Sequence, residues 1–319
     1  MFQTFQNNST INVQNTGFLK LSHGHQMFWE IFGSNDGIPV VFIHGGPGAR
    51  SMTIHQEFFD SNYWKAVFFD QRGCGRSKPS IEIENNNTDL LVEDLEKLRK
   101  HLKFDKWLLF GGSWGSTLAL CYAIKYPEKC LGLLLRGIFL GTKSEVNWFL
   151  CEMGRFFPEA YRKFLLAFGF SINSKPSADE ILEKAYAKLF DKDPNIYLPA
   201  AEAWASYEIS CATLEYGDRK MTGYPALSIS RIEAHYFVNN CFLKANYILN
   251  NTNKIKDLPI TIIQGRHDVI CPPFAAFKLK ENLNNCELII VENSGHSAFE
   301  KGIKKALLDS MNQFKEILV

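Results

Sequence analysis

The sequence predicts an α/β fold with a mostly parallel sheet, helices on both faces and an inserted helical segment. Short apolar runs bounded by turn residues recur through the first 140 residues, and the pattern resumes after residue 250. Nearly continuous apolar runs of this length are typical of strands buried on both faces of a parallel sheet. The predicted strands cover residues 39–43, 66–69, 107–110, 131–135, 259–263 and 287–291.

Helical periodicity separates the predicted strands. Four leucines recur at helical spacing within residues 88–102, and Asn87 or Thr88 can cap the start of this helix. A second helix is predicted over residues 117–126, where Pro127 ends it. Helices that alternate with buried strands are the crossover connections of a parallel sheet.

The strand pattern is absent from residues 141–250, where the composition is aromatic and helical. We expect this segment to form a helical cap, inserted into an α/β core of residues 1–140 and 251–319. A cap over the sheet places a pocket between two layers. Before the first buried strand, residues 18–22 and 27–32 predict an antiparallel hairpin at the sheet edge.

Composition argues against several classes of function. The chain has 35 Lys and Arg residues and 34 Asp and Glu residues, so its net charge is close to zero. The overall electrostatic field therefore does not attract nucleic acid or an anionic membrane. The longest apolar run, residues 131–140, is interrupted by Arg136 and is too short to span a bilayer. The eight cysteines include no Cys-x-x-Cys pair, and we expect neither metal binding nor disulfides. Residues 1–10 lack a signal-peptide pattern, so we expect a cytoplasmic chain that starts near Met1.

Ser113 lies directly after a predicted strand, within the sequence Gly-Gly-Ser-Trp-Gly of residues 111–115. A nucleophilic serine at a strand-to-helix turn needs small neighbours, because the strand and helix backbones approach closely there. Gly111 and Gly115 meet this requirement. A serine hydroxyl is a weak nucleophile at neutral pH, so this prediction also requires a histidine base and a carboxylate.

Asp268 and His296 supply the required acid and base. Each follows one of the last two predicted strands, and the order serine, aspartate, histidine is that of the α/β-hydrolase fold. The alternative is that Asp268 only forms a turn and His296 is a surface residue, but three coincident placements disfavour it. His267 is a competing base, although it lies beside the acid on one loop and would have difficulty reaching Ser113.

A glycine-rich turn follows the first buried strand, with the sequence His-Gly-Gly-Pro-Gly at residues 44–48. In this fold, that turn supplies one backbone donor for the oxyanion, and the residue after the nucleophile supplies the other. We therefore expect the N–H groups of Gly46 and Trp114 to form the oxyanion hole. His44 is expected to serve the turn itself and not proton transfer.

Five motifs together resemble the prolyl iminopeptidases, and the resemblance covers nearly the whole chain. They are the turn at residues 44–48, the sequence Asp-Gln-Arg-Gly-Cys-Gly-Arg-Ser at 70–77, the serine motif at 111–115, and residues 265–268 and 294–296. This resemblance implies a serine aminopeptidase that removes N-terminal proline from short peptides without a metal or another cofactor.

The resemblance also implies how the substrate is recognised. Two cap glutamates bind the protonated proline amine in this family, and the matching residues are Glu208 and Glu233. A tryptophan commonly precedes the first of them, whereas Tyr207 stands there in this chain, so the pocket shape can differ. Phe139 and Trp148 are candidates for the wall around the proline ring, with simple core packing as the alternative.

Two other functions fit the same residues. One is an esterase or amidase with the same triad and a cap suited to an uncharged acyl group. The other is a ligand-binding relative that kept the fold without catalysis, which the complete set of Ser113, Asp268 and His296 argues against. Cys271, three residues after Asp268, is a candidate neighbour of the site, although such a cysteine is more often inert packing.

Overall fold

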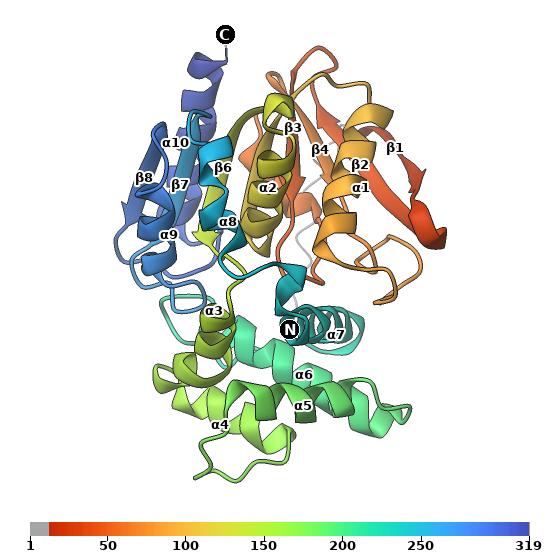
Figure 1. Cartoon of the computed structure of the whole chain (residues 1–319), viewed down its shortest axis with the longest axis vertical. Helices are drawn as coiled ribbons and strands as arrows, with labels where there is room; N and C mark the ends of the chain where they lie inside the picture. Colours follow the sequence, from red (N-terminus) through yellow and green to blue (C-terminus); the bar gives the residue numbers. More distant parts are fainter. Residues whose placement is uncertain (1–12, 319) are drawn as a thin grey trace, which may run out of the picture.

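The structure, a computed structural model, describes residues 13–318 of the chain, so the predictions for residues 1–10 lie outside the described residues. Its centre is an eight-stranded sheet with the strand order β1-β2-β4-β3-β5-β6-β7-β8 (Figure 1). The strands are β1 (Val13–Lys20), β2 (Gln26–Gly33), β3 (Ile38–Ile43), β4 (Trp64–Phe69), β5 (Trp107–Ser113), β6 (Cys130–Ile138), β7 (Ile260–Gly265) and β8 (Cys286–Val291).

The sheet is parallel except at one edge. Strand β1 pairs antiparallel with β2, and β2 pairs antiparallel with β4, whereas β4, β3, β5, β6, β7 and β8 pair in parallel. The predicted hairpin at the sheet edge is therefore confirmed. All six predicted parallel strands are present, each one to four residues longer than its apolar run.

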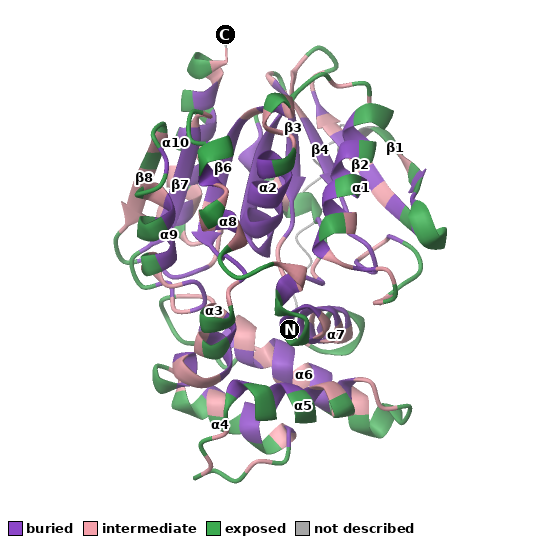
Figure 2. Cartoon of the chain, viewed as in Figure 1, coloured by how far each residue is buried: buried purple, intermediate pink, exposed green. Residues whose placement is uncertain are grey.

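Burial on both faces explains why apolar and polar residues do not alternate along the central strands. Every residue of β5 and β7 is buried, and Figure 2 shows the buried residues concentrated in the middle of the sheet. Large apolar side chains on one face of the sheet pack against α1, α2 and α9, and those on the other face pack against α10. Helices therefore cover both faces, as predicted. These helices are α1 (Thr88–His101), α2 (Trp114–Lys125), α9 (Pro273–Lys280) and α10 (Lys301–Ile317).

Local chemistry sets the starts of the first two helices. The side chain of Asn87 accepts a hydrogen bond from the Leu90 N–H over 3.0 Å, so Asn87 is the N-cap of α1. Helix α2 begins at Trp114, three residues before the predicted start at Thr117. Gly115 lowers helix propensity and conceals this first turn in the sequence.

The segment predicted as a cap is helical. Helices α3 to α6 gather at one end of the molecule, next to α7 (Figure 1). The short helix α8 packs against α2 instead, so it adjoins the sheet body. The division at residues 140 and 250 stays a prediction. The helices of the segment are α3 (Lys143–Asn147), α4 (Pro158–Ala167), α5 (Ala178–Leu189), α6 (Pro194–Cys211), α7 (Gly223–Val238) and α8 (Tyr247–Asn250).

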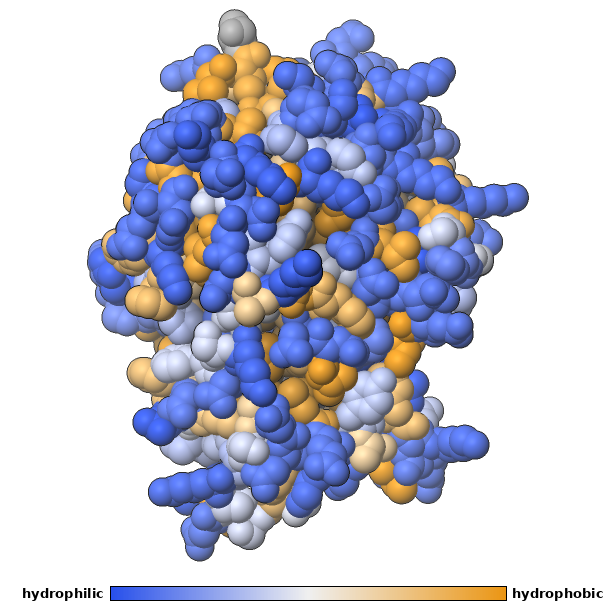
Figure 3. Space-filling model, viewed as in Figure 1, coloured by the Kyte–Doolittle hydropathy of each residue, from blue (hydrophilic) through white to orange (hydrophobic). Residues whose placement is uncertain are grey.

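The surface is mainly hydrophilic on the face shown in Figure 3, with apolar residues in scattered groups. Within residues 13–318, no helix combines the length and the apolar character that crossing a bilayer requires.

Candidate functional site

Ser113 lies at a sharp turn between β5 and α2. Its backbone has φ 57° and ψ −129°, a conformation that residues other than glycine rarely adopt and that concentrates at functional sites. Gly111 and Gly115, two residues before and two residues after Ser113, lie where a side chain has no room. A Cβ on Gly111 would lie 2.3 Å from the carbonyl oxygen of Gly115, and one on Gly115 would lie 2.1 Å from that of Ile43. The glycines predicted from the motif are therefore required by close backbone contact.

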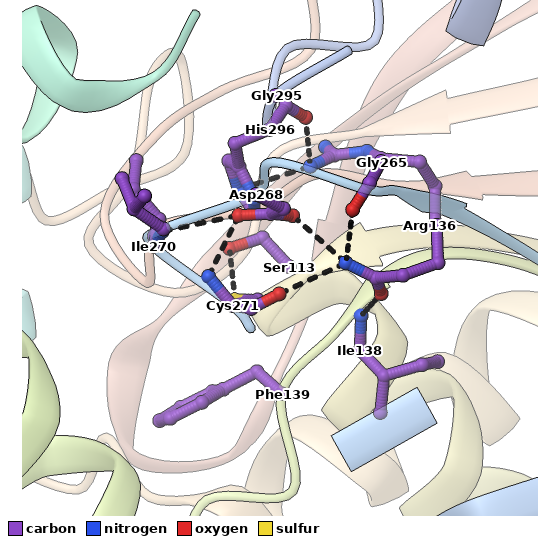
Figure 4. A network of polar contacts seen from close by, with 12 residues as sticks. Ser113, Arg136, Ile138, Phe139, Gly265, Asp268, Ile270, Cys271, Gly295 and His296 are labelled. Atoms are coloured by element: carbon purple, nitrogen blue, oxygen red, sulfur yellow. Dashed lines mark hydrogen bonds and ion pairs between the residues drawn. The ribbon is translucent and has the colours of Figure 1, made fainter. Parts of the chain in front are cut away.

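Asp268 and His296 are directly paired. The His296 Nδ1 atom lies 2.7 Å from Oδ2 of Asp268 (Figure 4). The other carboxylate oxygen, Oδ1, accepts hydrogen bonds from the backbone N–H groups of Ile270 (3.0 Å) and Cys271 (2.8 Å). Burial lowers the pKa of His296, although the Asp268 charge opposes this shift. The imidazole is therefore neutral at neutral pH.

Gln264, in β7, holds Asp268 in place and was not predicted from the sequence. Its Nε2 donates to Oδ2 of Asp268 over 3.2 Å and to the carbonyl oxygen of Cys271 over 2.9 Å. Its Oε1 accepts from the backbone N–H of Ile138 over 3.1 Å. The available signal was a polar residue at the end of an otherwise apolar buried strand, because buried amides need specific partners.

The serine hydroxyl faces the same group of residues. Ser113 Oγ lies 4.0 Å from Sγ of Cys271, whose thiol has a pKa raised by burial and so stays protonated. The Nε2 atom of His296 lies 2.9 Å from Nη1 of Arg136, and the hydrogen bonds within residues 13–318 include none between Ser113 and His296. Catalytic hydrogen bonds often form fully only when substrate is bound. Arg136 interrupts an apolar strand, which was its only sequence signal.

The glycine-rich turn after β3 packs against the serine turn. A Cβ on Gly45 would lie 3.2 Å from the carbonyl oxygen of Gly112 and 3.5 Å from Cβ of Ser113. Gly46 has φ 107°, which favours glycine. The turn is thus placed where it can present backbone N–H groups beside Ser113, but the oxyanion roles of Gly46 and Trp114 stay a prediction.

Neither of the two other histidines near these motifs forms a hydrogen bond with Ser113 within residues 13–318. His44 is buried, its Nε2 accepts from the backbone N–H of Gln71 over 3.0 Å, and its Nδ1 lies 3.0 Å from the carbonyl oxygen of Gly45. It therefore serves the turn, as expected. His267 is exposed to solvent at the surface.

Glu208 and Glu233 lie on the adjacent helices α6 and α7. Glu233 is 2% exposed, and its Oε2 accepts a hydrogen bond from Nε1 of Trp204 over 2.6 Å. Burial raises the pKa of Glu208 to about 7. Burial, and then the charge of Glu208, raise the pKa of Glu233 well above its ordinary value. The two carboxyl groups are thus close enough to oppose each other's ionisation, and a cation beside them would relieve this repulsion.

Trp204 was missed in the sequence. It precedes Glu208 by four residues, so both side chains lie on one face of α6. Tyr207 takes no part in this pair: it is buried, and its hydroxyl donates to the carbonyl oxygen of Phe149 over 3.2 Å.

Phe139 and Trp148 lie near two different parts of the candidate site: Phe139 near Trp204 and Glu233, and Trp148 near Asp268. The rings of Phe139 and Phe237 lie 6.3 Å apart, and that of Phe237 lies 6.2 Å from Trp204, so aromatic contacts extend from Phe139 to the partner of Glu233. Trp148 donates from Nε1 to the carbonyl oxygen of Val269 over 2.6 Å, next to Asp268. Both candidates lie near the site, and their contact with substrate stays a prediction.

The side chains that commonly bind metal ions are not clustered in the described part of the chain. Within the described part of the chain, no group of three or more His, Cys, Asp or Glu side chains could hold a metal ion. All eight cysteines lie in this part and are free thiols.

Comparison with known proteins gives relatives across nearly the whole chain. The alpha/beta hydrolase fold family matches residues 38–303. A proline iminopeptidase from Arabidopsis thaliana is 40% identical over 327 residues, which cover 99% of this chain and 85% of that protein. A proline iminopeptidase from Neisseria gonorrhoeae is 41% identical over 300 residues, which cover 93% of this chain and 94% of that protein.

Solved structures support the fold. An esterase from Exiguobacterium antarcticum matches with a TM-score of 0.60 at 19% identity, covering 94% of this chain and all of that one. A proline iminopeptidase-related protein from Thermus thermophilus matches with a TM-score of 0.59 at 16% identity, covering 96% and 98%. These similarities show an α/β-hydrolase fold, and the identity to the curated relatives is more specific. The chain belongs to the proline iminopeptidase family of α/β-hydrolases.

Proposed function

We propose that the protein is a serine aminopeptidase that releases N-terminal proline from short peptides, with Ser113, His296 and Asp268 as its catalytic triad. The observation that carries this proposal is the 2.7 Å pairing of His296 with Asp268 beside a serine held at a strained turn. This arrangement provides a neutral base whose tautomer is fixed by a carboxylate. The family relationship supports the activity, and the pair of cap glutamates supports the substrate.

Glu208 and Glu233 are proposed to bind the protonated amine of the proline. A secondary ammonium group offers two N–H donors, and two carboxyl groups with raised pKa values gain most from a nearby positive charge. Phe139 and Trp148 are proposed to contact the apolar ring. Because a neutral acyl group offers no such charge, this recognition favours a free amino terminus.

The reaction then follows from the triad. Ser113 attacks the carbonyl carbon of the proline while His296 takes the hydroxyl proton, and the N–H groups of Gly46 and Trp114 stabilise the oxyanion. When the C–N bond breaks, His296 gives that proton to the leaving amine, which leaves a prolyl ester on Ser113. A water molecule, deprotonated by His296, attacks this ester, and the proton returns to Ser113 as proline departs.

A substrate panel tests the proposal. We expect prolyl 2-naphthylamide to be cleaved much faster than the alanyl, leucyl and acetyl-prolyl analogues. Ser113→Ala and His296→Ala are expected to lower kcat by several orders of magnitude, on the order of 10⁶-fold as for other serine-protease triads. Glu208→Gln and Glu233→Gln are expected to impair prolyl substrates while sparing p-nitrophenyl acetate. Normal prolyl cleavage by both glutamine variants would disprove the amine-binding role.

The two alternatives give different results in the same experiments. An esterase or amidase with a neutral acyl pocket would cleave the nitrophenyl ester far faster than any prolyl amide. A ligand-binding relative without catalysis would show no labelling of Ser113 by a fluorophosphonate.

We also propose a cytoplasmic location. The eight free thiols support it, because reducing compartments keep cysteines in this state. Fractionation of cells that express the tagged protein tests this proposal, and recovery with an oxidising compartment would contradict it.

A further inference from the structure

A cavity lies beside the catalytic residues, between the turn after β3 and the loop after β8. Its volume is about 240 Å³, below the roughly 300–1,000 Å³ of pockets for drug-sized ligands, so it suits one small residue. The residues that border it include Gly45, Gly112, Arg136, Ala212, Ser297 and Phe299. Gly45 and Gly112 adjoin Ser113, and Ser297 follows His296, so the cavity adjoins the proposed nucleophile and base.

The charges around this cavity are positive. Arg50 and Arg136 border it, and none of the described residues that line it is acidic. His55 also borders it, but burial lowers the pKa of His55 to about 4, so its ring is neutral at neutral pH. The carboxylates of Glu208 and Glu233 are not among its lining residues. The carboxyl groups of Glu208 and Glu233 and the guanidinium group of Arg136 therefore border two separate spaces, and Arg50 lies at the exposed edge of the second one.

Arg136 has unused binding capacity. Its Nη1 contacts Nε2 of His296 over 2.9 Å and donates to the carbonyl oxygen of the same residue over 2.8 Å. Its Nε is buried with no hydrogen-bond partner, and the salt bridges within the described residues include none for Arg136. A guanidinium group has five donors that match a carboxylate, and a buried donor without a partner is costly. Arg136 therefore retains hydrogen-bond donors that match an anion, although the Asp268 charge already acts on its guanidinium group.

The chemistry of the leaving group identifies this anion. The leaving nitrogen must come within hydrogen-bond distance of His296 Nε2 to receive its proton. In a dipeptide, the terminal carboxylate is bonded to the same Cα as that nitrogen, so its oxygens lie about 3–4 Å from the nitrogen. Arg136 already touches Nε2 and thus lies within reach of that carboxylate.

We propose that Arg136 binds the free α-carboxylate of the residue after proline, so that the enzyme prefers prolyl dipeptides to substrates lacking a charge there. This inference rests on the proposed function. Binding of the carboxylate also draws Nη1 away from His296, which frees Nε2 to accept the proton of Ser113. The substrate class is therefore a dipeptide with a cationic amino end and an anionic carboxyl end, each matched by an opposite charge in the site.

The test compares prolyl-alanine with prolyl-alaninamide, which differ only in this charge. The quantity measured is the ratio of their kcat/KM values at pH 7, here named the carboxylate ratio. In the wild-type enzyme we expect a carboxylate ratio of about ten or more, because hydrogen bonds to charged groups have about this effect. The ratio is expected to fall to near one in Arg136→Gln and to recover in part in Arg136→Lys, which keeps the charge.

Arg50→Gln is the matched control, because it removes an exposed cation that borders the same cavity. The Arg50→Gln variant is expected to keep the wild-type carboxylate ratio. If the ratio falls to near one in Arg50→Gln but not in Arg136→Gln, the assignment to Arg136 is overturned. Circular dichroism checks that the Arg136 and Arg50 variants are folded. The carboxylate ratio of the wild-type enzyme tests the proposal even if a variant fails to fold.

Two results separate this inference from the proposed function. A wild-type carboxylate ratio near one, with prolyl 2-naphthylamide cleaved normally, overturns the carboxylate site alone. Failure of the wild-type enzyme to cleave any prolyl substrate, the naphthylamide included, overturns the proposed function itself.

Discussion

The indole Nε1 of Trp204, on α6, donates to Oε2 of Glu233, on α7, over 2.6 Å. This hydrogen bond fixes the direction of a buried carboxyl group whose pKa is raised by burial and by the charge of Glu208. Because a charged acceptor benefits from a donor more than a neutral one does, the indole favours the ionised form that binds a cation.

Trp204→Phe removes this donor and keeps an aromatic ring. We expect KM for prolyl 2-naphthylamide to rise about tenfold, from the loss of about 1–3 kcal/mol at a buried carboxylate. Hydrolysis of p-nitrophenyl acetate should change little. Trp29→Phe is a suitable control, since the buried Nε1 of Trp29 has no hydrogen-bond partner in the described structure. Equal losses with the ester and the prolyl amide would contradict a role in amine binding.

The buried glutamate pair makes stability depend on pH. The pKa of Glu208 rises from 4.5 to about 7 on folding, so the folded state binds the proton more tightly. The associated stability is present below pH 4.5 and is lost as pH rises through about 7. At pH 8, Glu208→Gln is therefore expected to be more stable than the parent by about 3 kcal/mol, and at pH 4.5 most of this difference should be gone.

Urea unfolding at both pH values measures this effect. Glu183→Gln is the control, because it makes the same substitution at an exposed residue on α5. A Glu208→Gln variant that is less stable than the parent at pH 8 would mean that the carboxylate is stabilised by contacts and not strained by burial.

Gln264→Leu should slow every substrate to a similar extent. Gln264 acts through Asp268 and not on the substrate, so kcat is expected to fall about tenfold for amide and ester alike, with KM nearly unchanged. The backbone N–H of Ile138 also loses its acceptor, which should lower the free energy of unfolding by about 1–3 kcal/mol. Stability loss with an unchanged kcat would assign Gln264 a purely structural role. Gln264→Glu keeps an acceptor oxygen for the Ile138 N–H but replaces the donating NH2 with a second oxygen, so it tests whether the donated hydrogen bonds are the essential ones.

Gly115→Ala should disrupt the turn that carries Ser113. The added Cβ would lie 2.1 Å from the backbone oxygen of Ile43, so β3 and α2 must separate. We expect a loss of more than about 2 kcal/mol in stability, in the range known for overpacked cores, together with loss of activity. Gly217→Ala is the control, because its new Cβ would meet only the flexible side chain of Arg219 at 3.4 Å. Thermal unfolding distinguishes the two variants, and similar transition temperatures would show that the turn can adjust.

The sequence predicted the features that depend on neighbouring residues. The strands of the parallel sheet were recognisable because burial on both faces removes alternation, as in β5. The serine turn was recognisable because close backbone contact demands glycine at positions 111 and 115. Asp268 and His296 were found from their positions after strands β7 and β8, and the structure pairs them directly.

The features that were missed join residues distant in the chain. Gln264 reaches across to Ile138, and Arg136 contacts His296, which is 160 residues away. No local pattern encodes such pairs, because they arise only when neighbouring strands align. The predicted start of α2, at Thr117, is three residues later than the observed start at Trp114. Glycine has a low helix propensity, so Gly115 does not resemble a helical residue in the sequence, although the close approach of β3 requires a glycine there.

The hydrogen bond from Trp148 to Val269 has a mechanical consequence. It fastens the helical segment to the loop that also carries Asp268, one residue before Val269 in the chain. A movement that carries Trp148 away from the sheet must break this bond or pull on the loop, and pulling would displace the carboxylate that orients His296. The position of the helical segment and the orientation of His296 are thus mechanically linked through a single hydrogen bond.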